Sequence, residues 1–97
     1  MKVIFTESAK RELRAITLYI AKHNLLRAKS FSKELRIACQ KLGEMSERFE
    51  RVARYDSMRK RSYGNYVIFY KVAVEQIETI HIYHGAMDFD ALDLGES

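Results

Sequence analysis

Residues 63–84 read YGNYVIFYKVAVEQIETIHIYH, and this stretch decides the fold. It holds two runs rich in Tyr, Val, Ile and Phe, separated by a polar break at Glu75 and Gln76, which is the pattern of a β-hairpin. The first run, residues 66–72, has apolar side chains in both of its alternating sets. We therefore expect both faces of this strand to be covered, or one face to be kept for a partner.

The second run predicts which side chains share a face of the sheet. Strict alternation over residues 77–84 places Ile77, Thr79, His81 and Tyr83 on one face and Glu78, Ile80, Ile82 and His84 on the other. Residues 58–63 form a third predicted strand, joined to the first run by a turn at Gly64 and Asn65. Together the three strands predict an antiparallel meander.

The first half of the chain predicts one strand and two helices. Residues 2–5 form a short strand that has to join the sheet, and Thr6 or Ser8 can cap the helix that follows. We expect this helix to run to about Lys22 and to be stopped by Asn24, since Asn tolerates the left-handed conformation at a helix end. Each helix carries one apolar stripe at spacings of three and four: Ala9, Leu13, Ile16 and Ile20, and then Ala28, Phe31, Leu35, Ala38, Leu42 and Met45.

The short link between the two helices predicts an antiparallel helical hairpin packed on the sheet. Residues 46–57 show no sustained period, and we interpret them as a loop or a ragged helix end. The predicted order is β-α-α-β-β-β, an α+β fold in one domain spanning residues 1–97. Residues 86–97 are expected to form a loose acidic tail.

Composition narrows the class of protein. The 97 residues are 47% hydrophobic, contain one Cys, and include no apolar run near the ~18 residues of a membrane span. The start of the chain shows no secretory signal, so we expect a cytoplasmic protein that does not enter membranes. The formal net charge is +4, which suits an anionic partner such as nucleic acid or an acidic protein, or else is an ordinary solvated surface.

Several stretches, taken in this order, resemble the ParE/RelE superfamily of bacterial toxins. They are the opening Thr6-Glu7-Ser8-Ala9, the helix end Tyr19-Ile20-Ala21, the helix start with Ala28 and Phe31, the strand Tyr66-Val67-Ile68-Phe69-Tyr70, and Ile80-His81-Ile82-Tyr83-His84-Gly85 running into Asp88. The resemblance covers most of the chain and favours the ParE branch. It implies the toxin of a type II toxin–antitoxin system, of the kind associated with plasmid stabilisation, which is not an enzyme and needs no cofactor.

The ParE resemblance also implies two protein partners. One is DNA gyrase, the target, and the other is a cognate antitoxin that neutralises the toxin. The antitoxin segment is expected to pair with a sheet edge or to lie along the helical hairpin. Direct binding to nucleic acid is not expected except through the antitoxin.

Two other functions stay open. The RelE branch implies a ribosome-dependent mRNA nuclease, for which Arg59, Lys60 and Arg61 would contact phosphate. Against it, Met87 stands where the family commonly has a basic residue, and the chain has no Lys or Arg after Lys71. The third possibility is a module that binds an antitoxin without being toxic.

Five residues are the candidate partner-binding site: Arg59, Arg61, Tyr66, Tyr70 and His84. The two Arg residues share a face of their strand. They either bind a partner, namely an acidic antitoxin segment or the target, or are solvated charges that protect an edge strand from pairing. The two Tyr residues are either core or, if exposed, anchors for a partner. No catalytic residue and no metal site are expected, and Cys39 is expected to be a small buried side chain.

Overall fold

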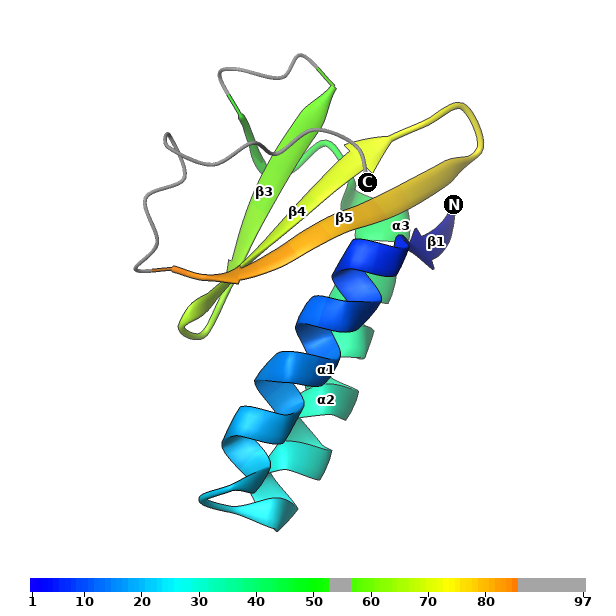
Figure 1. Cartoon of the computed structure of the whole chain (residues 1–97). Helices are drawn as coiled ribbons and strands as arrows, with labels where there is room; N and C mark the ends of the chain where they lie inside the picture. Colours follow the sequence, from blue (N-terminus) through cyan, green and yellow to red (C-terminus); the bar gives the residue numbers. More distant parts are fainter. Residues whose placement is uncertain (53–56, 86–97) are drawn as a thin grey trace.

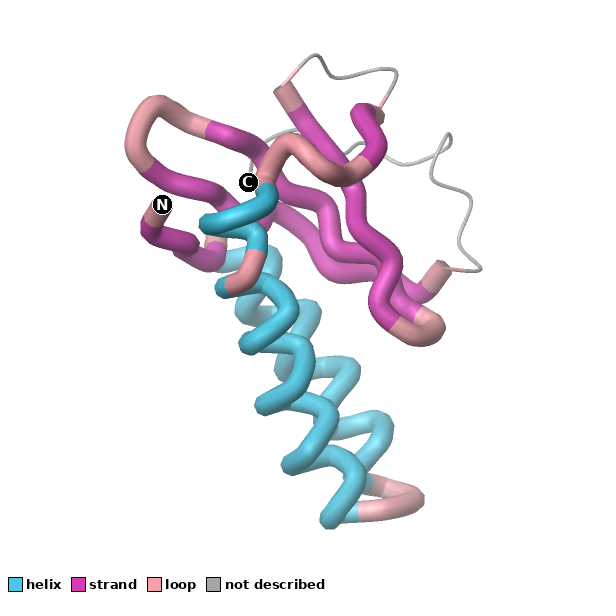
Figure 2. The backbone as a smooth tube through the Cα atoms, turned by 180° about the vertical axis from the view of Figure 1, so that it is seen from behind, coloured by secondary structure: helices cyan, strands magenta, loops and turns pink. Residues whose placement is uncertain are grey.

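The computed structural model describes residues 1–52 and 57–85, which form a sheet with a helical hairpin on one of its faces (Figures 1 and 2). The predicted tail at 86–97 and residues 53–56 lie outside the described part of the chain. The elements are β1 (Lys2–Phe5), α1 (Glu7–Ala21), α2 (Leu25–Gln40), α3 (Leu42–Met45), β2 (Glu50–Arg51), β3 (Met58–Tyr63), β4 (Tyr66–Val72) and β5 (Gln76–His84).

The strands lie in the order β1-β5-β4-β3-β2. The pairs β5–β4, β4–β3 and β3–β2 are antiparallel, which confirms the predicted meander, and β1 joins it parallel to β5. The turn between β3 and β4 uses Gly64 with a φ of 57°, a conformation that L side chains rarely adopt. β2 is an addition to the prediction: two residues of the supposed loop at 46–57 form an edge strand, too short to leave a periodic pattern.

A β-bulge corrects the predicted faces of β5. The register shifts between Phe69 and Tyr70, so that Tyr70 pairs with Thr79 whereas Phe69 pairs with His81. Alternation is broken at the extra residue, Ile80. Ile77 and Ile82, predicted on opposite faces, therefore belong to the same cluster beneath the helices. A one-residue insertion moves every later side chain to the other face, and nothing in the local sequence marks it.

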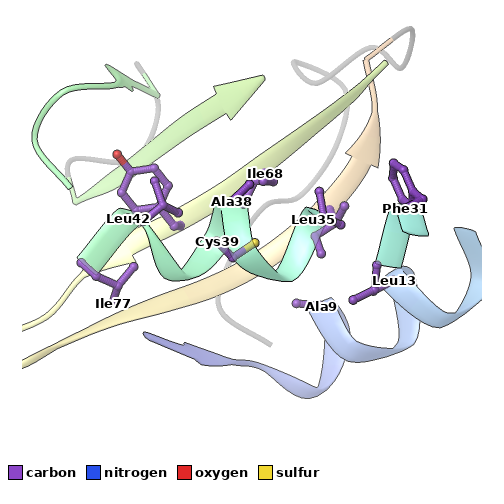
Figure 3. Close-up of a cluster of buried hydrophobic side chains, with 11 residues drawn as sticks. Ala9, Leu13, Phe31, Leu35, Ala38, Cys39, Leu42, Ile68 and Ile77 are labelled. Atoms are coloured by element: carbon purple, nitrogen blue, oxygen red, sulfur yellow. The ribbon is translucent and has the colours of Figure 1, made fainter. Parts of the chain in front are cut away.

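Two core clusters cover the two faces of β4, which is the first of the two outcomes that its doubly apolar pattern left open. The larger lies under the helices, where the predicted stripes of α1 and α2 meet the sheet (Figure 3): Ala9, Leu13, Phe31, Leu35, Ala38, Cys39, Leu42, Ile68, Tyr70, Ile77 and Ile82. The smaller lies on the opposite face and contains Met58, Val67, Phe69 and Ile80. Phe69 and Tyr70, neighbours on β4, are both fully buried, one in each cluster.

Two side chains of the first helical turns attach α1 to β5. Thr6 caps α1 by accepting from the Ala9 N–H at 3.2 Å, and its hydroxyl donates to the Ile80 carbonyl at 2.9 Å. Glu12 accepts from the Ile82 N–H at 2.9 Å, and its other carboxylate oxygen lies 2.9 Å from His81 Nδ1. β1 pairs with β5 only as far as Thr79. Past that point, the side chains of Thr6 and Glu12 bond to backbone groups of Ile80 and Ile82 on the outer edge of β5.

The prediction for Asn24 was wrong. Asn24 has extended backbone (φ −159°, ψ 100°) and caps the start of α2, its Oδ1 accepting from the Arg27 N–H at 3.0 Å. An Asn between two helices can end the first helix or cap the start of the second. Here it caps the second helix, because an unpaired N–H in the first turn of that helix needs an acceptor. Among the described residues, no helix is long and apolar enough to cross a membrane.

Candidate functional site

One depression on the described surface is a groove formed by α1, α2 and β1, with a volume of about 570 Å³. We call it the hairpin groove, and its lining residues are Ile4, Phe5, Lys10, Leu13, Arg14, Thr17, Leu18, Ser32 and Arg36. Three of them are cationic and none is acidic. Phe5, Leu13 and Leu18 supply an apolar surface, so the groove suits an extended ligand that is both apolar and negatively charged.

The cations of the hairpin groove lie on its two helical walls. Lys10 and Arg14 come from successive turns of α1, and Arg36 comes from α2. The Arg36 guanidinium lies 5.7 Å from the centre of the Phe5 ring, a cation–π contact that holds it over the apolar floor. Lys10 is 3.4 Å from the exposed Glu7 carboxylate, a pair that water screens.

Two of the sequence-predicted residues, Tyr66 and His84, meet in a second depression of about 470 Å³ on the other side of α1. We call it the aromatic pocket; it is lined by Ala15, Ile16, Tyr19, Asn65, Tyr66 and His84. The Tyr66 and His84 rings meet edge to face at 5.4 Å, and Phe31 supports Tyr66 from the core at 5.2 Å. Aromatic side chains held in this way can receive an apolar side chain of a partner.

Arg59 and Arg61 lie on the face of the sheet that the helices cover. Arg59 donates to the carbonyls of Glu47 and Phe49, at 3.2 and 2.7 Å. Arg61 donates to the Ala38 carbonyl at 2.9 Å, near the C-terminal end of α2, and its guanidinium lies 5.0 Å from the Phe49 ring. β2 pairs with β3, so β3 is not an edge strand. Arg59 and Arg61 therefore do not serve to protect an exposed edge from pairing with another chain. In the isolated chain they hold the segment after α2 against the sheet.

Lys60 lies on the opposite face of β3. It pairs in register with Phe69, a member of the smaller cluster, and its ammonium group is 3.4 Å from Glu50. The three consecutive basic residues 59–61 therefore point to two faces of the sheet, as residues of a strand do. They do not form one cluster that could surround a phosphate.

Tyr70 and Cys39 are buried. Tyr70 is fully buried in the larger cluster and donates its hydroxyl proton to the Ser46 carbonyl at 2.6 Å, so it belongs to the core in this structure. Burial raises the pKa of the Tyr70 phenol. Cys39 is also fully enclosed, and burial raises the pKa of its thiol to about 11, so the reactive thiolate is scarce at neutral pH.

One hydrogen-bonded group links α2 to β3 at the surface. The Tyr63 hydroxyl donates to Glu34 at 2.9 Å, and Arg27 reaches the same carboxylate at 2.9 Å. The Arg27 hydrogen bond, followed by that from Tyr63, lowers the pKa of Glu34. The Glu34 carboxylate in turn raises the pKa of Tyr63, because an anion beside the phenol opposes its ionisation.

The hairpin groove was absent from the predicted site, although its signal is visible in the sequence. The apolar stripe of the first helix was identified, whereas Lys10 and Arg14 were not assigned to a site. Residues 13–33 contain five cations and no Asp or Glu: Arg14, Lys22, Arg27, Lys29 and Lys33. Such a bias over this part of the helical hairpin indicates a surface for an anionic partner.

Comparison with known proteins agrees with this architecture. The sequence matches the family described as "ParE toxin of type II toxin-antitoxin system, parDE" over residues 3–89. A search of curated proteins found no match. Nine chains of solved structures match, among them one titled "Chromosomal ParDE TA system from P. aeruginosa", with a TM-score of 0.75 at 15% identity, covering 87% of this chain and 95% of the other.

The structural likeness, at that identity, shows a shared fold. The family match extends from β1 through the whole helical hairpin and meander. The chain therefore belongs to the ParE toxin family of type II toxin–antitoxin systems.

Proposed function

We propose that this protein is a toxin that binds DNA gyrase and blocks its action, and that a cognate antitoxin neutralises it by lying in the hairpin groove. Membership of the ParE family supports both parts of the proposal. The observation that carries the antitoxin site is the groove itself, with three cations, no carboxylate and an apolar floor.

The hairpin groove suits an acidic amphipathic segment for two reasons. The lining places Lys10, Arg14 and Arg36 around Phe5 and Leu13, so that a segment with carboxylates flanking apolar side chains meets complementary groups throughout. β1, an edge strand of the sheet, contributes Ile4 and Phe5 to the same groove. A partner chain lying there can therefore use helix-in-groove contacts, strand pairing, or both.

A non-enzymatic mechanism accords with the placement of the basic residues of β3. Cleavage of RNA by a RelE-type mechanism needs cations that converge on one phosphate. Here Arg59 and Arg61 donate to backbone carbonyls on one face, and Lys60 lies on the other face beside Glu50. This division favours inhibition through binding over mRNA cleavage.

The antitoxin site is tested by a charge reversal in the groove. The probe is the small protein encoded by the reading frame next to this gene, and its affinity is measured by calorimetry. Arg14→Glu should weaken binding by about tenfold or more, because a like charge then faces the acidic segment. Arg11→Glu, the same change three residues away on α1 and outside the groove, is the matched control and should bind almost as wild type. Equal affinities for both variants would exclude the groove.

The target is tested with purified DNA gyrase in a supercoiling assay. The wild-type protein should inhibit supercoiling, and addition of the antitoxin should restore it. Normal supercoiling in the presence of a stoichiometric excess of the protein would remove gyrase as the target. Mapping of mRNA ends after induction in bacteria distinguishes the RelE-type alternative, which requires new ends on translated messages.

A further inference from the structure

The end of the helical hairpin projects beyond the sheet (Figure 1). It carries large apolar side chains that are mostly exposed. Leu18 and Tyr19 in the last turns of α1 are 61% and 62% exposed, and Leu25 and Leu26 at the start of α2 are 60% and 80% exposed. We call residues 18–26 the hairpin tip. Four large apolar side chains gathered within nine residues on a projecting end are typical of an interaction site.

Hydrogen bonds within the turn connect the two helices of the hairpin tip. The N–H groups of His23 and Asn24 both donate to the Ile20 carbonyl, at 3.0 and 2.9 Å, and close the end of α1. The Asn24 side chain then caps α2. Exposed side chains on such a turn lose little backbone freedom when they are buried against a partner, which favours binding.

The charge around the tip points to an acidic partner. Residues 13–33 contain five Lys or Arg and no Asp or Glu, whereas the whole chain has a net charge of +4. Across this stretch Arg27 is paired with Glu34, but Lys22 at the end of α1 has no carboxylate within several residues on either side in the sequence. Repulsion between like charges also opposes self-association of two tips.

The arrangement of the apolar groups favours a protein over a lipid surface. Leu18 lines the hairpin groove, whereas Tyr19 lines the aromatic pocket on the other side of α1, so the two point in different directions. The turn itself, Lys22-His23-Asn24, is polar and is flanked by the apolar side chains. Insertion into a bilayer requires the reverse order, with apolar groups leading and cations behind. A concave protein surface can surround such a tip from several sides.

We propose that the hairpin tip is the surface with which this protein engages its target, and that it inserts into an acidic cleft of that protein. This inference rests on the proposed toxin function, and it assigns the target to a surface that adjoins the antitoxin site in the hairpin groove and shares Leu18 with it. Leu26, which is absent from the lining of the groove, distinguishes the two surfaces.

The test uses Leu26→Asp in the full chain, with Val74→Asp as its matched control. Both residues are exposed, at 80% and 92%, so neither change removes core packing. An Asp in the first turn of α2 is also favoured by the helix dipole, so the variant keeps its fold. We expect Leu26→Asp to raise the concentration needed to inhibit purified gyrase by at least about tenfold, as loss of a central apolar contact does. Val74→Asp should inhibit as wild type does, and both should bind the antitoxin with unchanged affinity.

The outcomes are distinguishable. If wild type and Leu26→Asp inhibit gyrase equally, the tip is not the target-binding surface, and the proposed function stands. If wild type neither inhibits gyrase nor arrests growth, the proposed function fails, and the tip inference fails with it. If wild type binds phosphatidylglycerol vesicles and Leu26→Asp does not, while inhibition of gyrase is the same for both, the tip is a membrane contact and the inference of a protein partner is overturned.

Discussion

At the scale of single residues, the hydrogen-bonded group of Tyr63, Glu34 and Arg27 shows how charge holds α2 against β3. The pKa of the Glu34 carboxyl is lowered from 4.5 in the folded chain, chiefly by Arg27 and next by Tyr63. A depressed pKa means that the folded state binds this proton less tightly than the unfolded state. The ionised Glu34 carboxylate therefore stabilises the folded state above pH 4.5, and this stabilisation is lost as the pH falls through the pKa of Glu34 in the folded state.

Tyr63→Phe should consequently lower the midpoint of thermal unfolding slightly at pH 7, because the hydrogen bond to Glu34 is lost at a part-buried site that water still screens. The difference from wild type should shrink as the pH is lowered below 4.5, where the carboxyl becomes protonated in both proteins. Thermal unfolding followed by circular dichroism between pH 7 and pH 3 measures it. A difference that stays constant over this range would show that the carboxylate does not take part.

At the scale of elements, a single threonine both caps α1 and, together with Glu12, attaches it to β5. Thr6 Oγ1 accepts from the Ala9 N–H and donates to the Ile80 carbonyl. Thr6→Ala removes both hydrogen bonds, and we expect it to reduce the free energy of unfolding by about 1–2 kcal/mol. Urea denaturation measures the loss.

Thr6→Ser is the matched control for this prediction, since it keeps the hydroxyl. Its free energy of unfolding should stay within about 0.5 kcal/mol of wild type. If Ser and Ala at this position are equally destabilising, the methyl group rather than the hydroxyl is what matters, and the account of the α1 start is wrong.

The predicted and observed bounds of the helices and strands agree where the local sequence pattern is strong and differ where it is weak. β3 was predicted at its observed bounds because Gly64 and Asn65 form a strong turn signal after it. The helices were recognisable because each has one apolar stripe that the larger core cluster buries. β2 was missed because two residues cannot show a period. Asn24 was misassigned because the end of one helix and the start of the next compete for the same residue type.

At the scale of the whole molecule, the positive charge of the helical hairpin should make association with an acidic partner depend on salt. The hairpin groove and the hairpin tip both lie within this cationic region. Because the Debye length shrinks from roughly 10 Å at 0.1 M to roughly 3 Å at 1 M salt, the Kd for the antitoxin should rise by about tenfold over that range. Most of the change should appear in the association rate.

Stopped-flow association at several salt concentrations checks this expectation. Arg14→Glu should flatten the dependence, since it reduces the positive charge at the groove, whereas Val74→Asp, far along the chain from the hairpin, should alter it less. An association rate that does not change with salt would mean that apolar contacts alone bring the two proteins together.

The resemblance of several short stretches to known toxins indicated the superfamily, and the family match confirms it. Local patterns in the chain were enough to predict an α+β architecture, a helical hairpin and an antiparallel meander, because periodicity and turn chemistry act over a few residues. They could not establish where the candidate side chains end up. Arg59 and Arg61 donate hydrogen bonds to backbone carbonyls, and Tyr70 lies in the core. Tyr66 meets His84 beside Tyr19. None of these contacts could be predicted locally, because each joins segments that are distant in sequence. The bulge at Phe69 and Tyr70 and the cationic hairpin groove likewise arise only when helices and strands pack together, because a register or a cavity is a property of neighbours in space.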